Sequence, residues 1–335
     1  MISAFGWAPT GLLLLCLGAL AGALLTKLAT PLFAGPNALL RRLEPASRFH
    51  LLAALASLPV LGALALFLIA FGPSLLHAAG IVADHCGRHI HHQGLHLCFL
   101  HYPPPQISAS LLALTLLAMA GPSWKGTRTL AALRSSYGQT GALFSLATYD
   151  KTRRVYVVDS QQPFALSAGI FRPRILIASS LVKTLSPEQL AAVIAHERAH
   201  QRRRDGLLLS LIYPALALHI PAVANRLRNA LHLAMEQACD EEAATAVKSR
   251  LTVAEALLAV ERAHQNAPSR IPALLPGLHF ESHPLEARVT GLLRNSWARP
   301  AWPILGTTAV ALAVALIIKL PWLHHVLEHA LALFL

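Results

Sequence analysis

The sequence predicts a mainly α-helical membrane protein with about four transmembrane helices and one inserted α+β domain. Three observations support this fold class. Of the 335 residues, 55% are hydrophobic and 13% are charged, whereas a soluble domain carries about 25% charged residues. The apolar residues gather in long runs, and one segment, 122–300, is long enough to fold as a separate polar domain.

Three apolar runs lie in the membrane region 1–121, where we expect transmembrane helices over about 11–30, 49–71 and 106–121. A helix needs about 20 apolar residues to cross a hydrocarbon core of about 30 Å, so the third run is short for a span. We expect a fourth transmembrane helix over 301–320, followed by a short amphipathic tail over 321–335.

The formal net charge of +12 is spread unevenly along the chain. Lys and Arg gather after the first and third apolar runs, whereas the second connection, 72–105, holds one Arg and no Lys. Because basic connections stay in the cytoplasm, we expect 122–300 to be cytoplasmic and both termini to be extracytoplasmic. The basic segments lack interleaved aromatic residues, so we expect the lipid bilayer, and no nucleic acid, as a direct partner.

The outer connection 72–105 is rich in side chains that bind metals. It contains seven histidines and two cysteines, which are His77, His85, His89, His91, His92, His96 and His101 with Cys86 and Cys98. Such donors could hold a second metal ion, zinc or copper. The alternative is a solvated loop of biased composition with a disulfide bond between its two cysteines.

The inserted segment is expected to contain both strands and helices. Residues 155–158 and 174–178 are short apolar runs of the kind that forms strands. Gly169 and Pro173 lie between them and predict a turn.

A helix is expected from Ser186, which has the features of an N-cap, to about Arg204. His196 and His200 are four residues apart, so they share one face of this helix. Two imidazoles at that spacing can bind one Zn²⁺. Glu197 lies beside them and is the expected general base, which takes a proton from the attacking water. An ordinary charged helix face is the alternative interpretation.

A catalytic zinc site of this kind needs a third protein ligand. Glu236 is the best candidate, and Asp240, four residues later on the same helix face, would hold one of the imidazoles. Asp205 is a second candidate for such support, or a salt-bridged helix end. If Glu236 joins the two histidines, the apolar run 207–224 cannot be a single membrane crossing. It must then be a re-entrant hairpin, a membrane-lying segment or a buried core piece.

The segment 163–175, the motif at 196–205 and the cluster 236–241 together resemble the BlaR/MecR-type peptidases. The resemblance implies a zincin-like (gluzincin) metalloprotease domain in a protein of the bacterial inner membrane. It implies a peptidase that relieves a transcriptional repressor, often by cleaving it, after self-cleavage. A winged-helix repressor is the partner we expect. The resemblance also supports Glu236 as a zinc ligand and Glu197 as the general base.

Two departures from that family pattern are visible. β-Lactam sensors carry a C-terminal penicillin-binding domain after the fourth span, and this sequence ends soon after its fourth apolar run, so β-lactam sensing is not expected. The segment 282–289 is more similar to the HtpX and CAAX-prenyl endopeptidases. By that analogy His283 or Arg288 would stabilise the oxyanion, although the segment could equally be an ordinary boundary between a loop and a helix.

The sequence therefore predicts an integral-membrane zinc endopeptidase with one catalytic Zn²⁺, acting in signal transduction on a cytosolic repressor or regulator. One alternative is an HtpX-type protease that serves membrane-protein quality control. A second alternative, from another class, is a non-proteolytic metal receptor that binds its ligand through the histidine-rich loop.

Overall fold

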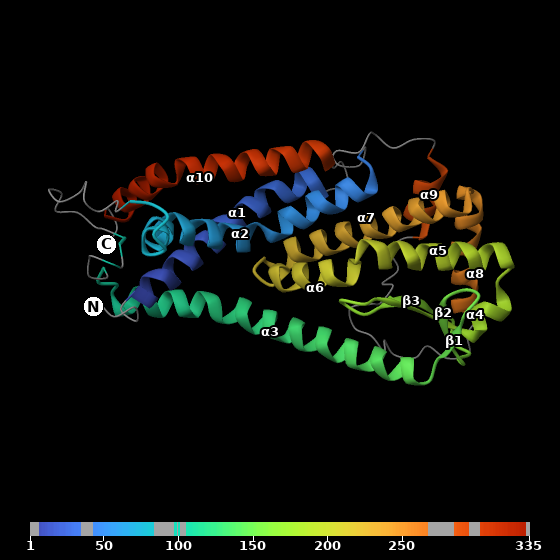
Figure 1. Ribbon diagram of the computed structural model, residues 1–335. Helices are drawn as coiled ribbons and strands as arrows, with labels where there is room; N and C mark the ends of the chain where they lie inside the picture. Colours follow the sequence, from blue (N-terminus) through green and yellow to red (C-terminus); the bar gives the residue numbers. More distant parts are fainter. Residues whose placement is uncertain are drawn as a thin grey trace.

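The computed structural model describes residues 7–34, 43–83, 97, 98, 100, 105–266, 285–294 and 302–332. These residues form ten helices and one four-stranded sheet. The helices α1, α2, α3 and α10 make up one part of the molecule, and the sheet and the other helices make up the second part (Figure 1). α1 begins and α10 ends at the end of the molecule that is farthest from the sheet.

Three of the long helices are long and apolar enough to cross a membrane, which are α1 (Ala8–Ala34), α2 (Pro45–Ala78) and the Gly306–Ala332 part of α10 (Trp302–Ala332). The expected mainly helical membrane class is thus confirmed in outline. The third expected span lies at the start of α3 (Ala109–Ser145), which is long enough but is not among the helices that are apolar enough to cross a membrane. A count of four spans therefore stays a prediction.

α1 and α2 approach each other closely because glycines line their contact. A Cβ atom on Gly18 would lie 2.3 Å from the carbonyl oxygen of Gly62, and one on Gly22 would lie 2.3 Å from the carbonyl oxygen of Leu58. No side chain fits at such distances. Contacts between small residues are typical of packed membrane helices, where they let the backbones come close together.

A proline inside α2 frees a backbone carbonyl for a second contact with α1. Proline donates no backbone hydrogen bond, so Pro59 leaves the carbonyl of Leu55, four residues earlier, without its usual helical partner. The hydroxyl of Thr26 on α1 is shared between this carbonyl, at 3.0 Å, and the carbonyl of Gly22 in its own helix, at 2.8 Å. Within a membrane, where water cannot replace a missing partner, such a bond holds the two helices in one register.

A second proline in α2 prepares a contact with α10 in the same way. Pro73 releases the carbonyl of Ile69, and the Nδ1 atom of His324 on α10 lies 3.0 Å from that oxygen. One turn further along α10, the Glu328 carboxylate accepts a hydrogen bond of 2.8 Å from the backbone N–H of Leu97. These contacts join α10 both to α2 and to the connection that follows α2.

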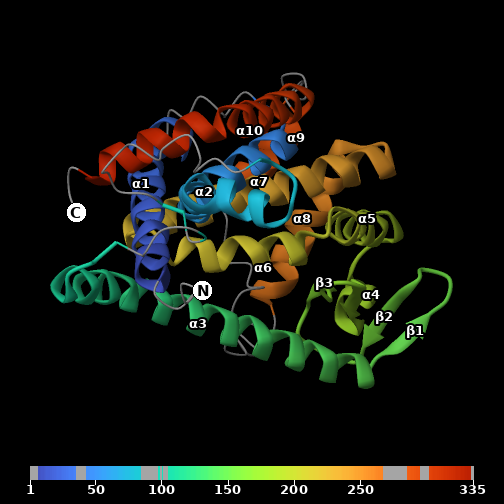
Figure 2. The ribbon, with the colours of Figure 1, turned by 60° about the vertical axis from the view of Figure 1, so that its left-hand side comes forward.

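The four strands form one sheet in the order β1-β2-β4-β3, with the bounds β1 (Thr148–Asp150), β2 (Val155–Val158), β3 (Ala165–Ala168) and β4 (Arg174–Ala178). β2 and β4 are parallel, and the two edge strands pair antiparallel to them. The strands expected over 155–158 and 174–178 are confirmed, and Gly169, with φ +114°, lies in the expected turn. Figure 2 shows that α3 ends beside this sheet.

α5 (Pro187–Arg203) is the helix that was expected from Ser186 to about Arg204. The Ser186 hydroxyl accepts a hydrogen bond from the N–H of Gln189, and the Gln189 side chain accepts one from the N–H of Ser186. At the other end Arg204 has a left-handed backbone, with φ 54°. This sharp turn ends α5 and directs the next residue, Asp205, back towards its last turns.

The apolar run 207–224 consists of most of α6 (Asp205–Leu216), a turn and the start of α7 (Pro221–Val247). α6 is about 18 Å long at 1.5 Å per residue, which is too short to cross a bilayer. Its residues Leu209, Ile212 and Leu216 are buried in one cluster with residues of α2 and α7. Of the three alternatives, the buried core piece agrees with this packing. Pro221 is the first residue of α7.

The remaining helices are α4 (Ser179–Thr184), α8 (Arg250–Gln265) and α9 (Leu285–Leu293). Residues of α8 and α9 pack with those of α5 and α7 in a second apolar cluster. α10 continues past Pro321 to Ala332 as one helix. Residues 321–332, the described part of the short amphipathic tail expected over 321–335, therefore continue the helix of the fourth apolar run, because an internal proline removes only one backbone hydrogen bond.

Candidate metal centre

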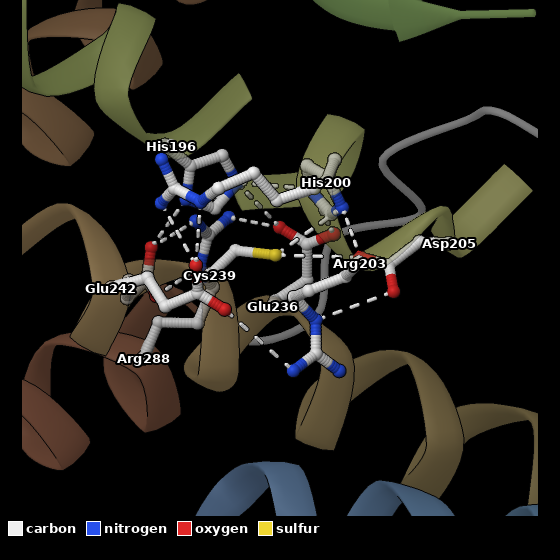
Figure 3. A network of polar contacts seen from close by, with 10 residues as sticks. His196, His200, Arg203, Asp205, Glu236, Cys239, Glu242 and Arg288 are labelled. Carbon is white, nitrogen blue, oxygen red and sulfur yellow. Dashed lines mark hydrogen bonds and ion pairs between the residues drawn. The ribbon is translucent and has the colours of Figure 1, made fainter. Parts of the chain in front are cut away.

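The candidate site lies where α5 faces α7 (Figure 3). α5 presents His196 and His200, whose Nε2 atoms lie 3.1 Å apart. The carboxylate of Glu236 on α7 lies 3.3 Å from the Nε2 atom of His196 and 3.6 Å from that of His200. These side chains are 8%, 14% and 10% exposed, in the order His196, His200 and Glu236. Three groups that can bind a metal thus meet at one sheltered point.

A carboxylate holds the other ring nitrogen of each histidine. The Nδ1 atom of His196 lies 2.9 Å from Asp240, and the Nδ1 atom of His200 lies 2.7 Å from Asp205. When the ring proton is on Nδ1, each neutral imidazole directs the lone pair of Nε2 towards Glu236. Metal-binding histidines in proteins are usually oriented by a carboxylate in this way.

Arg288 on α9 connects the two acidic residues of α7. Its Nε and Nη2 atoms donate to the two carboxylate oxygens of Asp240 at 2.9 and 2.7 Å, and its Nη1 atom lies 3.1 Å from Glu236. A paired contact of this kind fixes the geometry of a carboxylate as well as its charge. Arg288 therefore orients both acidic side chains, and the oxyanion role expected for it stays a prediction.

The support of His200 continues through Asp205. The Nε atom of Arg203 lies 3.3 Å from Asp205, and the thiol of Cys239 donates to the same carboxylate at 3.4 Å. Burial is the main reason why the pKa of the Cys239 thiol is raised well above its usual value. The thiol therefore keeps its proton and acts as a donor.

The charges around the centre suit a divalent cation. Four buried carboxylates belong to it, those of Glu197, Asp205, Glu236 and Asp240. Two arginines, Arg203 and Arg288, face them. Among the described residues this leaves an excess of two negative charges. Two imidazoles and one carboxylate are also the ligands of many catalytic zinc sites, which keep a fourth position open. The residues present therefore fit a zinc ion.

In the metal-free protein, protons on the histidines offset part of the same negative charge. Burial, the largest effect, lowers the pKa of His196, but the Asp240 and Glu236 contacts outweigh it and raise the pKa to about 10. The pKa of His200 is also raised, because the Asp205 and Glu236 carboxylates outweigh burial. Burial would raise the pKa of Glu236, but Arg288 and the histidines hold it well below its usual value. Glu236 therefore stays ionised at neutral pH.

Glu197 follows His196 on α5 and is 3% exposed. Burial raises the pKa of its carboxyl group, and the two nearby histidines oppose that effect only in part. In the part of the chain that the structure describes, no hydrogen bond or ion pair occupies this carboxylate. A carboxylate with a raised pKa and no fixed partner has the properties of a general base.

Seven of the residues expected from the sequence lie in or beside this cluster, which are His196, Glu197, His200, Asp205, Glu236, Asp240 and Arg288. His283 and most of the histidine-rich loop lie outside the described residues. The second metal site and the alternative disulfide therefore stay predictions.

Arg203 is a residue of the cluster that the sequence interpretation missed. A signal for it does exist, because it lies three residues after His200 and seven after His196, on the same helix face. The neighbouring arginine, Arg202, shows why a run of arginines is uninformative by itself. Its guanidinium pairs with Glu242 at the surface, at 2.8 Å.

Residues 142–292 match the family described as BlaR1 peptidase M56. This range runs from the end of α3 to α9 and includes every residue of the metal centre described above. The match thus covers the part of the chain that holds the candidate metal centre, and the predicted resemblance to the BlaR/MecR-type peptidases is confirmed.

The curated proteins that match include two proteases, each named "Protease HtpX homolog". The one from Salinibacter ruber is 28% identical over 42% of this chain and 61% of its own length. The one from Burkholderia mallei is 36% identical over 22% of this chain and 26% of its own length. The chain thus covers less than two thirds of either relative. No solved structure matches the chain.

Proposed function

We propose that the chain is a zinc endopeptidase of the bacterial inner membrane. The observation that best supports this function is the meeting of the His196 and His200 Nε2 atoms with the Glu236 carboxylate, beside the buried Glu197. A zinc ion bound there would polarise a peptide carbonyl and acidify the attacking water. Glu197 takes the proton from that water and returns it to the leaving amine.

The edge strand β3 offers a place for an extended substrate. β3 pairs with β4 on one side only among the described residues. The Gln201 side chain of α5 donates to the carbonyl of Pro173, in the turn that follows β3, and so joins this edge to the helix of the metal centre. A peptide that adds to a sheet edge is held by its main chain and is therefore accepted with many sequences. We infer that the substrate is an unfolded or extended segment of a protein.

The basic connections favour a peptidase domain, 122–300, in the cytoplasm and both termini outside. The four long helices support this arrangement, since α1 begins and α10 ends far from the sheet. In that compartment a cytosolic repressor or regulator, such as a winged-helix repressor, is the substrate we propose. The two relatives named HtpX homologues favour membrane-protein quality control as the alternative.

The variant Glu197→Gln tests the proposed chemistry. In full-length protein in lipid nanodiscs, we expect it to keep one bound zinc per chain and to lose cleavage of fluorescein-labelled casein by about 10²-fold or more. The exposed residue Glu188, in the first turn of the same helix, provides a matched control, and Glu188→Gln should cleave casein like the wild type. Undiminished cleavage by Glu197→Gln would overturn the proposal.

A comparison of the proteins cleaved in cells separates the two biological roles. Cells that express the wild type and cells that express Glu197→Gln should differ in one regulator if the role is signalling, or in many membrane proteins if it is quality control. Deletion of 84–98 tests the non-proteolytic receptor. Loss of most tightly bound metal in that variant would favour the receptor over the peptidase.

A further inference from the structure

The first turns of the membrane helix α2 lie against the metal centre. The Arg48 guanidinium donates to the side-chain oxygen of Gln237 on α7. Phe49, the next residue, is fully buried, and its ring centre lies 5.6 Å from the guanidinium carbon of Arg203. The reaction proposed above uses neither Arg48 nor Phe49, yet both contact residues that adjoin the metal ligands.

The first contact leads to Glu236. Gln237 follows Glu236 on α7 and is 6% exposed. While its oxygen accepts from Arg48, its amide nitrogen donates to the carbonyl of Ala287 on α9 at 2.7 Å. The next residue of α9 is Arg288, which holds Glu236 at 3.1 Å and also orients Asp240. Gln237 thus joins the start of α2 to the helix that carries this arginine.

The second contact leads to His200. Phe49 packs in the apolar cluster of α2, α6 and α7, and its ring faces the Arg203 guanidinium. Arg203 lies 3.3 Å from Asp205, which in turn lies 2.7 Å from the Nδ1 atom of His200. A cation over an aromatic ring away from water is held in place as well as attracted. Phe49 therefore holds Arg203 in place. Arg203 in turn holds Asp205, the carboxylate that orients His200.

We propose that Arg48 and Phe49 are positioning residues for the metal centre, the first acting through Gln237 and the second through Arg203. This inference rests on the proposed function and names a means of regulating the same site. The two routes begin on adjacent residues of one membrane helix and end at different metal ligands. A shift or rotation of α2 consequently acts on both ligands together, so the affinity for zinc depends on how the membrane helices pack.

The first route is tested by the zinc affinity of the full-length protein in lipid nanodiscs, measured against a chromogenic chelator. We expect Arg48→Met to weaken zinc binding about three- to tenfold, less than the 10–100-fold typical of groups that touch a ligand. Arg48→Lys, which keeps a charged donor, should recover part of the loss. Combined with Gln237→Met, Arg48→Met should add nothing to the effect of Gln237→Met alone, because both act in one route.

Phe49→Leu tests the second route, since it keeps an apolar side chain in the core but removes the ring. We expect a loss of zinc affinity of about threefold and a lower kcat on casein with an unchanged KM. His50→Gln is the control on the same turn, because His50 is exposed, its Nδ1 atom meets the carbonyl of Ala46 in its own helix, and its ring touches the edge of Phe49. Size-exclusion chromatography identifies any variant that fails to fold, and Arg48→Lys and Phe49→Leu then carry the test.

A merely structural role gives a different result. It would lower the melting temperature of these variants and leave zinc affinity and kcat as in the wild type, which would overturn the inference. Failure of the proposed function is recognised separately. In that case the wild type and His196→Ala would bind the same amount of zinc, whatever the behaviour of the α2 variants.

Discussion

Each histidine of the metal centre uses its two ring nitrogens for different purposes. The Nδ1 atom faces the carboxylate of Asp240 or Asp205, and the Nε2 atom faces the carboxylate of Glu236. This division depends on residues that come later in the chain than the histidines themselves. Asp205 reaches its ring because Arg204 has a left-handed backbone, and Asp240 reaches the other ring from α7.

Asp240→Asn should weaken zinc binding by about 10–100-fold, as is typical when the group that orients a metal-binding histidine is changed. The amide loses the charge that holds His196 and one half of the paired contact with Arg288. Competition with a chelator measures the effect. Glu241→Gln is a suitable control, because Glu241 pairs with Arg250 outside the centre. Equal affinities for Asp240→Asn and this control would contradict the expected role of Asp240.

Zinc affinity should rise with pH across the neutral range. The metal-free centre holds protons on its histidines, since the pKa of His196 is raised to about 10 and that of His200 is also raised. Zinc must displace these protons, so below these pKa values each displaced proton should strengthen binding about tenfold per pH unit. Isothermal titration in buffers of different ionisation enthalpy counts the protons released. Affinity that is the same at pH 6 and pH 8 would disagree with this expectation.

The clustering of the candidate metal ligands was predictable because helix geometry relates them. Four-residue spacing places His196 beside His200, and the same spacing relates Glu236 to Asp240. The contact between Arg48 and Gln237 was not predictable, because it joins segments far apart in the sequence and uses residue types that are common on any surface.

At the scale of elements, the secondary structure that the sequence predicted best has strong local causes. β2 and β4 are rich in valine and isoleucine, and α5 begins with a serine N-cap followed by proline. β3 has the sequence Ala-Leu-Ser-Ala and β1 has only three residues. Neither has a clear strand pattern by itself, because pairing with a neighbouring strand is what defines it.

The bond from Thr26 to the carbonyl released by Pro59 is expected to stabilise the pairing of α1 and α2. Thr26→Val keeps the shape of the side chain and removes the donor, so we expect a loss of about 1 kcal/mol in the free energy of unfolding, as for other hydrogen bonds between membrane helices. Unfolding in mixed micelles measures it. Thr115→Val is the control, since Thr115 donates only to Leu111 in its own helix. A loss no larger than that of the control would argue against this role.

At the scale of the whole molecule, the packing of α6 and α7 on α2 joins the part that holds the candidate metal centre to the long apolar helices. Phe49, Leu52 and Ala56 of α2 are buried in the same cluster as Leu227 and Leu231 of α7. The sequence predicted that the apolar run 207–224 does not cross the membrane, because a metal shared by α5 and α7 requires both on one side. It could not predict which helix covers that run, since apolar composition alone does not distinguish lipid from protein.

The proposed orientation predicts which surfaces a membrane-impermeant maleimide can reach. Cysteine at the exposed position of Thr152, in the turn between β1 and β2, should react only after the membrane is opened. Cysteine in place of Ile81, which is 70% exposed and follows α2, should react in intact spheroplasts. The unaltered chain gives the background from the native cysteines. The reverse pattern would show that the peptidase domain lies outside.

The carbonyl of Ile69 has a consequence for the biogenesis of the protein. α2 is synthesised long before α10, so the Ile69 carbonyl, which Pro73 leaves without a helical partner, has no His324 to pair with until α10 is made. The carbonyl that Pro59 leaves free can pair with α1 immediately, because α1 precedes α2. Arg288 lies on α9, shortly before α10, and is therefore also synthesised after the helices that carry the metal ligands. A nascent chain thus completes the candidate metal centre only shortly before α10, the last long helix among the described residues, is synthesised.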